Sequence, residues 1–171
     1  GDLKALTSNS GIKLEDHKGN IDATTSNASI EGVNIVGNLQ AYTSNGSIDL
    51  LNVTEDVIAS TSNGHIEIKQ CPSIERVSTS NGGIELELMT LNGDLDIITS
   101  NGKIELDISS FIDAEIKAST NNGKIFCDHP RFDPETVKNN YLTGKLGKGG
   151  YQLNISTSNS NVYIDSLEEL F

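Results

Sequence analysis

A short motif, a Thr followed two residues later by an Asn, repeats along the chain. Acidic side chains recur four residues after this Asn. Carboxylates at a constant spacing could together bind a divalent cation such as calcium, or a cationic peptide or polymer. Two carboxylates in a cleft could instead act as the acid and base of a sugar-cleaving enzyme. The remaining alternative is a solvated acidic face that keeps the protein soluble. The candidates at this position are Glu31, Asp49, Glu67, Glu85 and Glu105, joined two residues further on by Glu87 and Asp107.

Other groups of residues that could do chemistry are poorly represented. His17, His65 and His129 fall in different copies of the motif, and only His65 occupies a regular outward position. The run Cys127-Asp128-His129 supplies three adjacent donors, whereas a structural zinc site usually has four ligands. The sequence therefore predicts no catalytic residues and no cofactor, apart from weak surface binding of calcium at the acidic positions.

The copies of the motif follow a nearly fixed period. Their Asn residues are separated by 18 residues four times, and then by 20, 21 and 37 residues. A period of this length is typical of repeat architectures, in which each unit buries its apolar face by stacking on its neighbours. The Asn residues that mark the units are Asn9, Asn27, Asn45, Asn63, Asn81, Asn101, Asn122 and Asn159.

Apolar side chains alternate with polar ones on both sides of each Asn. Alternation with period two is typical of strands with one buried face, so each unit is expected to be a strand, a corner and a strand. Asn-Gly between such runs is also compatible with antiparallel hairpins. Equivalent positions of successive units are nearly identical, however, which favours parallel stacking about 4.8 Å apart. We therefore predict an all-β, single-domain parallel β-solenoid with about 18 residues per turn, and we favour a right-handed winding.

The motif itself is expected to build the corner. If the alternation continues, each Thr points inward, and its buried hydroxyl could bond to the backbone of the adjacent turn. Stacked Asn side chains can pair along the axis, and both Asn and Gly tolerate a left-handed backbone. A Thr row that binds ice or crystalline polysaccharide would need the Thr to point outward. The predicted corner ladder comprises Thr25, Asn27, Thr43, Asn45, Thr61, Asn63, Thr79, Asn81, Thr99 and Asn101.

The repeat changes character towards the C-terminus. We divide the single domain into regular repeats over 1–127, an irregular excursion with a Gly-rich turn over 128–150, a last repeat over 151–165 and a tail over 166–171. Solenoid ends expose strand edges, so the excursion, the tail and the aromatic residues gathered there are expected to form a cap. An aromatic patch for a partner is the alternative. The candidate cap residues are Phe126, Tyr163, Phe132 and Phe171.

The two cysteines are predicted to be unpaired. Cys71 belongs to the fourth unit and Cys127 to the seventh, so stacking in chain order would hold them roughly 14 Å apart, beyond the reach of a disulfide. Both replace apolar residues at inward positions, as small core side chains do.

The charge of the chain limits its partners. It carries 24 acidic and 12 basic residues among 171, a formal net charge of -12. Such a charge would repel a phosphate backbone, which argues against nucleic acid as a partner. No apolar run reaches membrane-spanning length. Gly1 stands where a Met would begin a chain and the repeat is under way at Leu3, so we expect a fragment of a longer protein.

Two stretches carry a family resemblance: GDLDIITSNGKIEL, whose pattern repeats along the chain, and GKLGKGGYQLNISTSNSNVYI near its end. Together they resemble the bacterial β-strand-repeat domains known as adhesin-like or toastrack domains, over Leu3 to Ile164. The resemblance implies a β-solenoid on the cell-envelope or extracellular side, in some members linked to envelope-stress sensing. It supplies no catalytic residues.

The sequence therefore predicts a non-enzymatic cell-envelope or surface module that presents a rigid acidic face to a protein, a cationic peptide or an envelope polymer. Two alternatives stay open. Solenoids can stack end to end into a structural polymer. A polysaccharide-active enzyme is disfavoured, because such a site needs a shaped cleft, and the regular turns before residue 128 carry no long loops.

Overall fold

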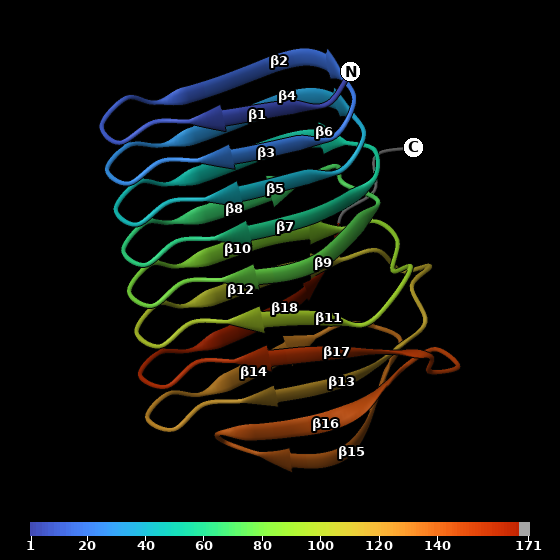
Figure 1. Ribbon diagram of the computed structural model, residues 1–171. Coiled ribbons are helices and arrows are strands. Elements are labelled where there is room, and N and C mark those ends of the chain that lie inside the picture. The colour runs from blue at the N-terminus through green and yellow to red at the C-terminus, as the bar shows by residue number, and fades with distance from the viewer. Residues whose placement is uncertain (168–171) are drawn as a thin grey trace.

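Two long β-sheets face each other along the molecule (Figure 1). The computed structural model describes residues 1–167. The ten-stranded sheet has the order β1 (Leu3–Leu6), β3 (Ile21–Thr24), β5 (Leu39–Tyr42), β7 (Asp56–Ser60), β9 (Ser73–Ser78), β11 (Leu95–Ile98), β17 (Tyr151–Ser156), β13 (Ala114–Ser119), β16 (Tyr141–Leu146) and β15 (Phe132–Lys138). The eight-stranded sheet has the order β14 (Ile125–Asp128), β18 (Val162–Ser166), β12 (Ile104–Ile108), β10 (Ile84–Leu88), β8 (Ile66–Lys69), β6 (Ile48–Val53), β4 (Ile30–Val36) and β2 (Ile12–Lys18).

One strand from each sheet, with the corner that joins them, forms one coil. β1 and β2 make the first coil, β3 and β4 the second, and so on to β11 and β12. Neighbouring coils pair in parallel through both sheets, and the chain descends one level with each coil (Figure 1). The predicted all-β parallel solenoid is confirmed.

Equivalent residues of neighbouring coils lie side by side. Ala5 pairs with Ala23 in the ten-stranded sheet, and Ile48 pairs with Ile66 in the eight-stranded sheet. The inward side chains of both sheets meet in one core of buried Ile, Leu, Val and Ala. Full burial of one large aliphatic side chain contributes roughly 1.5–3 kcal/mol. Equivalent side chains of successive coils thus form columns. A shift of one residue in the strand register would turn a whole column towards solvent, so the columns fix the register as well as stabilising the fold.

The last coil of the chain does not occupy the last place in the stack. β17 lies between β11 and β13, and β18 lies between β12 and β14, so residues 151–166 are inserted between the sixth and seventh coils (Figure 1). Leu153 pairs with Leu95 on one side and with Ile116 on the other. The apolar columns therefore stay continuous although the chain order is broken.

This insertion corrects the expected distance between the cysteines. The value of roughly 14 Å assumed stacking in chain order, but one further coil separates Cys71 from Cys127, which adds about 4.8 Å. Both cysteines are free. Burial raises the pKa of each thiol to about 11, so both remain protonated at neutral pH.

Residues 128–150, expected to be an irregular excursion, supply a β-hairpin. β15 pairs antiparallel with β16, and β16 pairs antiparallel with β13. Leu142 and Leu146 of β16 are buried, and Phe132 of β15 packs against the core. The pairing of β15 shifts register after Pro134. An edge strand interrupted by Pro is a poor template for further strands, so the hairpin closes this end of the ten-stranded sheet.

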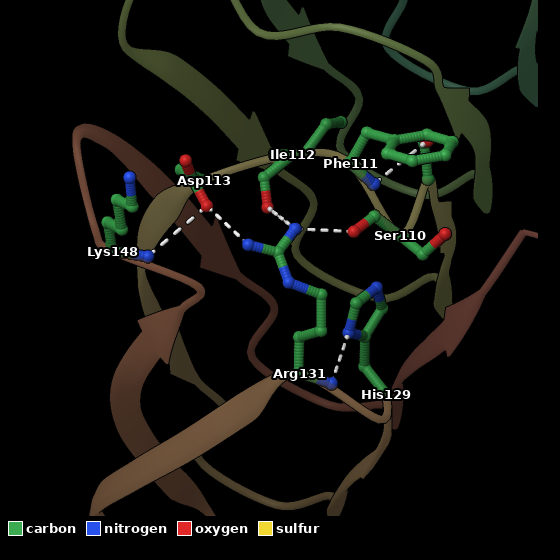
Figure 2. Close-up of polar contacts among 8 residues, drawn as sticks. Ser110, Phe111, Ile112, Asp113, His129, Arg131 and Lys148 are labelled. Carbon is green, nitrogen blue, oxygen red and sulfur yellow. Dashed lines mark hydrogen bonds and ion pairs between the residues drawn. The ribbon is translucent and has the colours of Figure 1, made fainter.

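An arginine fastens the hairpin to the connection between β12 and β13 (Figure 2). The Arg131 guanidinium donates to the carbonyl oxygens of Ser110 and Ile112, the latter at 3.3 Å. It also donates to Asp113 Oδ1 at 2.6 Å. The Lys148 backbone N–H, 3.2 Å from the same Oδ1, and the guanidinium together hold the pKa of the Asp113 carboxyl below its usual value.

A buried histidine completes this contact. His129 Nε2 lies 3.2 Å from the Ile108 carbonyl oxygen, and the Arg131 backbone N–H donates to His129 Nδ1 at 3.2 Å. Because Nδ1 accepts a hydrogen bond, the proton of the neutral ring resides on Nε2 and is donated to Ile108. His129 is thereby engaged in the fold on both ring nitrogens.

Candidate cation-binding face

The corners are held by the Thr residues of the repeated motif. Thr43 Oγ1 donates to the Ala28 carbonyl oxygen of the preceding coil at 2.9 Å and accepts from the Gly46 N–H of its own corner at 3.2 Å. Thr61 and Thr79 make the same pair of bonds. These Thr residues are buried, as the alternation indicated. Their hydroxyls join adjacent coils and are not available to an external ligand.

The Asn side chains of the corners form a continuous ladder. Each Asn Nδ2 donates to the Asn Oδ1 of a neighbouring coil at 2.6–2.7 Å. The ladder passes from Asn101 to Asn159 and then to Asn122, so it follows the order of the coils in space. Since Thr and Asn are both engaged between coils, the repeated motif is a device for stacking.

The corner glycines have a different role from the one expected. The sequence suggested that Asn and Gly there adopt a left-handed backbone, but positive φ angles occur elsewhere. A Cβ placed on Gly64 would lie 1.8 Å from the Gly46 carbonyl oxygen. Glycine at this corner lets the preceding coil approach closely, although Ser10, Ala28 and Ser160 occupy the equivalent position in three other coils. The non-glycine residues with positive φ are Asp16, Asn34, Asn52 and Gln70.

Three of these residues form a second polar ladder, which the sequence reasoning missed. Asn34 Nδ2 donates to Asp16 Oδ1 at 3.0 Å, and Asn52 Nδ2 donates to Asn34 Oδ1 at 2.9 Å. They stand seven residues after the corner Asn of the first three repeats. Extending the alignment of the repeats to that position would have found them.

The candidate carboxylates do lie in one column on the outer surface of the eight-stranded sheet. The register pairs Glu31 with Asp49, Asp49 with Glu67, Glu67 with Glu85 and Glu85 with Glu105. Burial of the Asp49 carboxyl and the nearby charge of Glu67 raise its pKa above the usual value. Like charges at this spacing repel by roughly 1 kcal/mol per pair even in water.

Lysines from the same face neutralise part of this column. Lys69 Nζ lies 2.7 Å from Glu67 Oε1 and 3.7 Å from Glu85 Oε1. Lys103 Nζ lies 2.7 Å from Glu105 Oε1. The sequence reasoning followed only the acids and missed these partners, although both lysines stand two residues from a column acid and so share its face.

A neighbouring column carries carboxylates that form no ion pair among residues 1–167, although Lys69 lies near enough to Glu87 to interact with its charge. We call this column the carboxylate row, and its members in spatial order are Glu87, Asp107, Asp165 and Asp128. Within residues 1–167 none of the four has an ion-pair partner. Burial and the charges of Asp165 and Glu87 raise the pKa of Asp107. The row is therefore the part of the face where added positive charge would relieve the most repulsion.

The candidate cap residues are divided between two places. Tyr163 and Phe126 continue the acidic column beyond Glu105, and their rings stack on the outer surface with centroids 5.2 Å apart. Phe126 is 47% exposed, so this pair does not cover the core. Phe132 lies in the hairpin that closes the end. Phe171 lies outside the described residues.

A shallow hollow of about 280 Å³ lies on the acidic face between β4, β6 and β8. Val33 and Leu51 contribute apolar surface to it, and charged groups line the rest: Glu31, Asp49, Glu67 and Lys69. Because its carboxylates outnumber the one ammonium group, it suits the aliphatic stem and charged head of a further lysine-like group.

A family model described as Toastrack DUF4097 matches residues 1–165. No match was found among curated proteins or solved structures. Within the part of the chain that the structure describes, no helix is long and apolar enough to cross a membrane.

Proposed function

The chain belongs to the Toastrack DUF4097 family, and from this premise we propose that it is a non-catalytic binding scaffold of the cell envelope or cell surface. Its carboxylate row and the adjoining acidic column bind a cationic segment of a partner protein. The observation that carries the proposal is the row itself, four neighbouring carboxylates without an ion-pair partner among residues 1–167.

Rigidity makes this arrangement effective. The row stands on β10, β12, β18 and β14, which pair in register in the middle and end of one sheet. Its carboxylates are therefore held at the strand spacing of about 4.8 Å before any partner arrives. A preorganised surface loses little conformational freedom on binding, which leaves more of the electrostatic attraction as affinity.

A cationic peptide fits the face better than a single metal ion does. The row extends over several strands, whereas one ion can contact only neighbouring carboxylates. Lysine or arginine side chains spaced along an extended peptide can each meet a carboxylate, and their stems can pack on Val33 and Leu51. Complementary charge of this kind also steers encounter and fixes the register of the partner.

Binding to a fluorescent oligolysine peptide tests the proposal. We expect saturable binding that weakens as salt is raised, because the attraction is between exposed charges. Asp107→Asn combined with Asp165→Asn removes two central charges of the row and should weaken binding at least about tenfold, the effect of losing close charge pairs. The matched control, Asp133→Asn with Glu135→Gln, removes the same charge from exposed positions on β15.

Two results would contradict the proposal. One is the absence of saturable binding by the unaltered protein. The other is equal weakening by the two double variants, since that would assign the binding to net charge rather than to the row.

End-to-end polymerisation receives less support. The hairpin of β15 and β16 closes one end of the ten-stranded sheet and carries Pro134 at its edge. A filament needs two complementary ends, and this one is poorly suited to pair with a further strand.

A further inference from the structure

His65, Glu67 and Glu85 form a cluster on the acidic face, at a place distinct from the carboxylate row. One nitrogen of the imidazole and one oxygen of each carboxylate all lie within 4.8 Å of one another. We propose that these three side chains bind a divalent transition-metal ion, with zinc as the representative. This inference goes beyond the proposed function, because it rests on coordination by particular atoms rather than on the summed charge of the face.

The backbone fixes two of the three ligands. Glu67 of β8 and Glu85 of β10 are register partners in adjacent parallel strands, so their side chains leave the sheet side by side. His65 stands two residues before Glu67 and therefore points from the same face. All three side chains are partly buried, which restricts their freedom before an ion binds.

A glycine provides room for the imidazole. The residue that neighbours His65 in the next coil is Gly83, and His65 Nδ1 lies 3.3 Å from where a Cβ of that residue would be. The equivalent position one coil further on is Lys103, whose side chain would crowd a ring placed in the same way. The ring can thus lean over Gly83, towards the strand that carries Glu85.

The ammonium group of Lys69 already lies close to the carboxylates of both Glu67 and Glu85. Lys69 Nζ approaches Glu67 Oε1 at 2.7 Å and Glu85 Oε1 at 3.7 Å. The two carboxylates are therefore oriented towards one positive centre, as they would be around an ion. Lys69 is also a competitor, because its ammonium group must swing away when a metal ion takes its place.

The donor set determines which ions are expected. Zinc binds imidazole nitrogen and carboxylate oxygen at about 2.0–2.2 Å, so small rotations of the three side chains are enough to bring them onto one ion. Calcium and magnesium prefer oxygen ligands alone, whereas imidazole suits zinc, copper and nickel. The site should therefore discriminate against calcium.

Calorimetric titration of the metal-stripped protein with zinc chloride tests the site, with the imidazole NMR signals recorded in parallel. We expect one saturable site that shifts the His65 signals, and at least about tenfold weaker binding for His65→Ala and for Glu85→Gln, comparable to the loss of partners around known metal ligands. Lys69→Met should bind zinc more tightly than the unaltered protein. Glu105→Gln, which removes the same charge from the next coil, should leave the affinity unchanged.

The outcomes separate the site from general attraction to the acidic face. If Glu105→Gln weakens zinc binding as much as Glu85→Gln does, or if His65→Ala binds as the unaltered protein does, the proposal is overturned. Saturation at another histidine without a change at His65 overturns it as well. Asp107→Asn with Asp165→Asn, which tests the peptide proposal, should leave zinc binding intact, so each proposal can fail without the other.

Discussion

The first six coils and the end of the chain reach the same stacking by different routes. From β1 to β12 each coil rests on the one before it, about 18 residues earlier. Beyond β12 the stack contains a coil from residues 151–166 between two coils that precede it in sequence, and a hairpin in place of a ninth coil. Nevertheless the Asn ladder runs through both regions at 2.6–2.7 Å. The place of a coil in the stack is therefore determined by the side chains that it adds to the columns, and not by its position in the sequence.

The two ends of the stack differ as well. At the N-terminal end β1 and β2 each have one strand partner, and Leu3, which points inward from β1, is 37% exposed. At the other end Leu142 and Leu146 of the hairpin are buried. In the ten-stranded sheet, inward apolar side chains are therefore buried in β16 of the hairpin and partly exposed in β1 at the opposite end.

The largest effect is expected from a methyl group at the corners. Gly64→Ala in the regular coils and Gly123→Ala beside the inserted coil each place a Cβ 1.8 Å from a backbone oxygen of the neighbouring coil. Each should cost up to about 4 kcal/mol, because the coils must move apart locally to admit the Cβ. Ala28 and Ser160 occupy the equivalent position in other corners, so the variants are expected to fold. Gly93→Ala, with nothing within 4 Å of the added Cβ, is the control. Denaturant unfolding measures all three, and a tolerated Gly123→Ala would show that the inserted coil is stacked less tightly.

Removing a side chain from each end should separate the covered end from the exposed one. Leu146→Ala empties a fully buried position of the hairpin and should cost about 2–4 kcal/mol. Leu3→Ala changes an inward residue of β1 that is 37% exposed and should cost less, about 1 kcal/mol. Thermal unfolding compares the two variants. Equal losses would mean that the hairpin does not protect the core.

Breaking the Asn ladder should have a smaller effect, and the same one in both regions. Asn159→Ala in the inserted coil and Asn63→Ala in a regular coil each remove two ladder bonds. A net loss of about 1 kcal/mol is expected for each, because the amides exchange these bonds for water when exposed. Denaturant midpoints of the pair check this. A cost confined to Asn63 would contradict the equivalence of the two regions.

The smallest effects should appear as opposite pH dependences. The pKa of Asp113 is lowered by the Lys148 N–H and Arg131, so its carboxylate stabilises the fold above the usual value of 3.8 and loses this contribution as pH falls through the lowered pKa. Burial and neighbouring acids raise the pKa of Asp107, so its charge costs stability at neutral pH and the cost disappears as pH falls through the raised pKa.

Substituting each of the two residues by Asn tests their opposite contributions to stability. Asp113→Asn should be less stable than the unaltered protein at pH 7, and Asp107→Asn more stable, with both differences shrinking on acidification. Thermal midpoints between pH 7 and pH 2.5 provide the measurement. Differences of the same sign would contradict the electrostatic assignment of one of the two residues.

The columns could be predicted from the sequence, whereas the order of the coils could not. Side chains such as Ile48 and Ile66 recur at one position with period two, and parallel pairing in register is the arrangement that buries all of them. The same uniformity allows coils to exchange places in the stack, since Leu153 pairs in register with both Leu95 and Ile116. The hairpin at 132–146 was hidden because it lacks the Thr-Ser-Asn corner of the repeats and because Pro134 stands within its first strand.

The candidate site was predicted in part for the same reason. The column of acids follows directly from the alternation of inward and outward side chains, once the strands are in register. Contacts such as Lys69 with Glu85 join different coils at unequal sequence separations and depend on side-chain reach. The role of Gly64 depends on the distance between backbones, which no property of the residue itself reveals.

The inserted coil also has a consequence for synthesis on the ribosome. The first six coils can form one after another as the chain emerges, because each needs only residues already made. The seventh coil, β13 and β14, has no native neighbour on its inner side until residues 151–166 exist, and the contact from Asn159 to Asn101 then spans 58 residues. Contacts of such long range are slow to form. Closure of this end of the stack is therefore expected to come later than the first six coils, once residues 151–166 have left the ribosome.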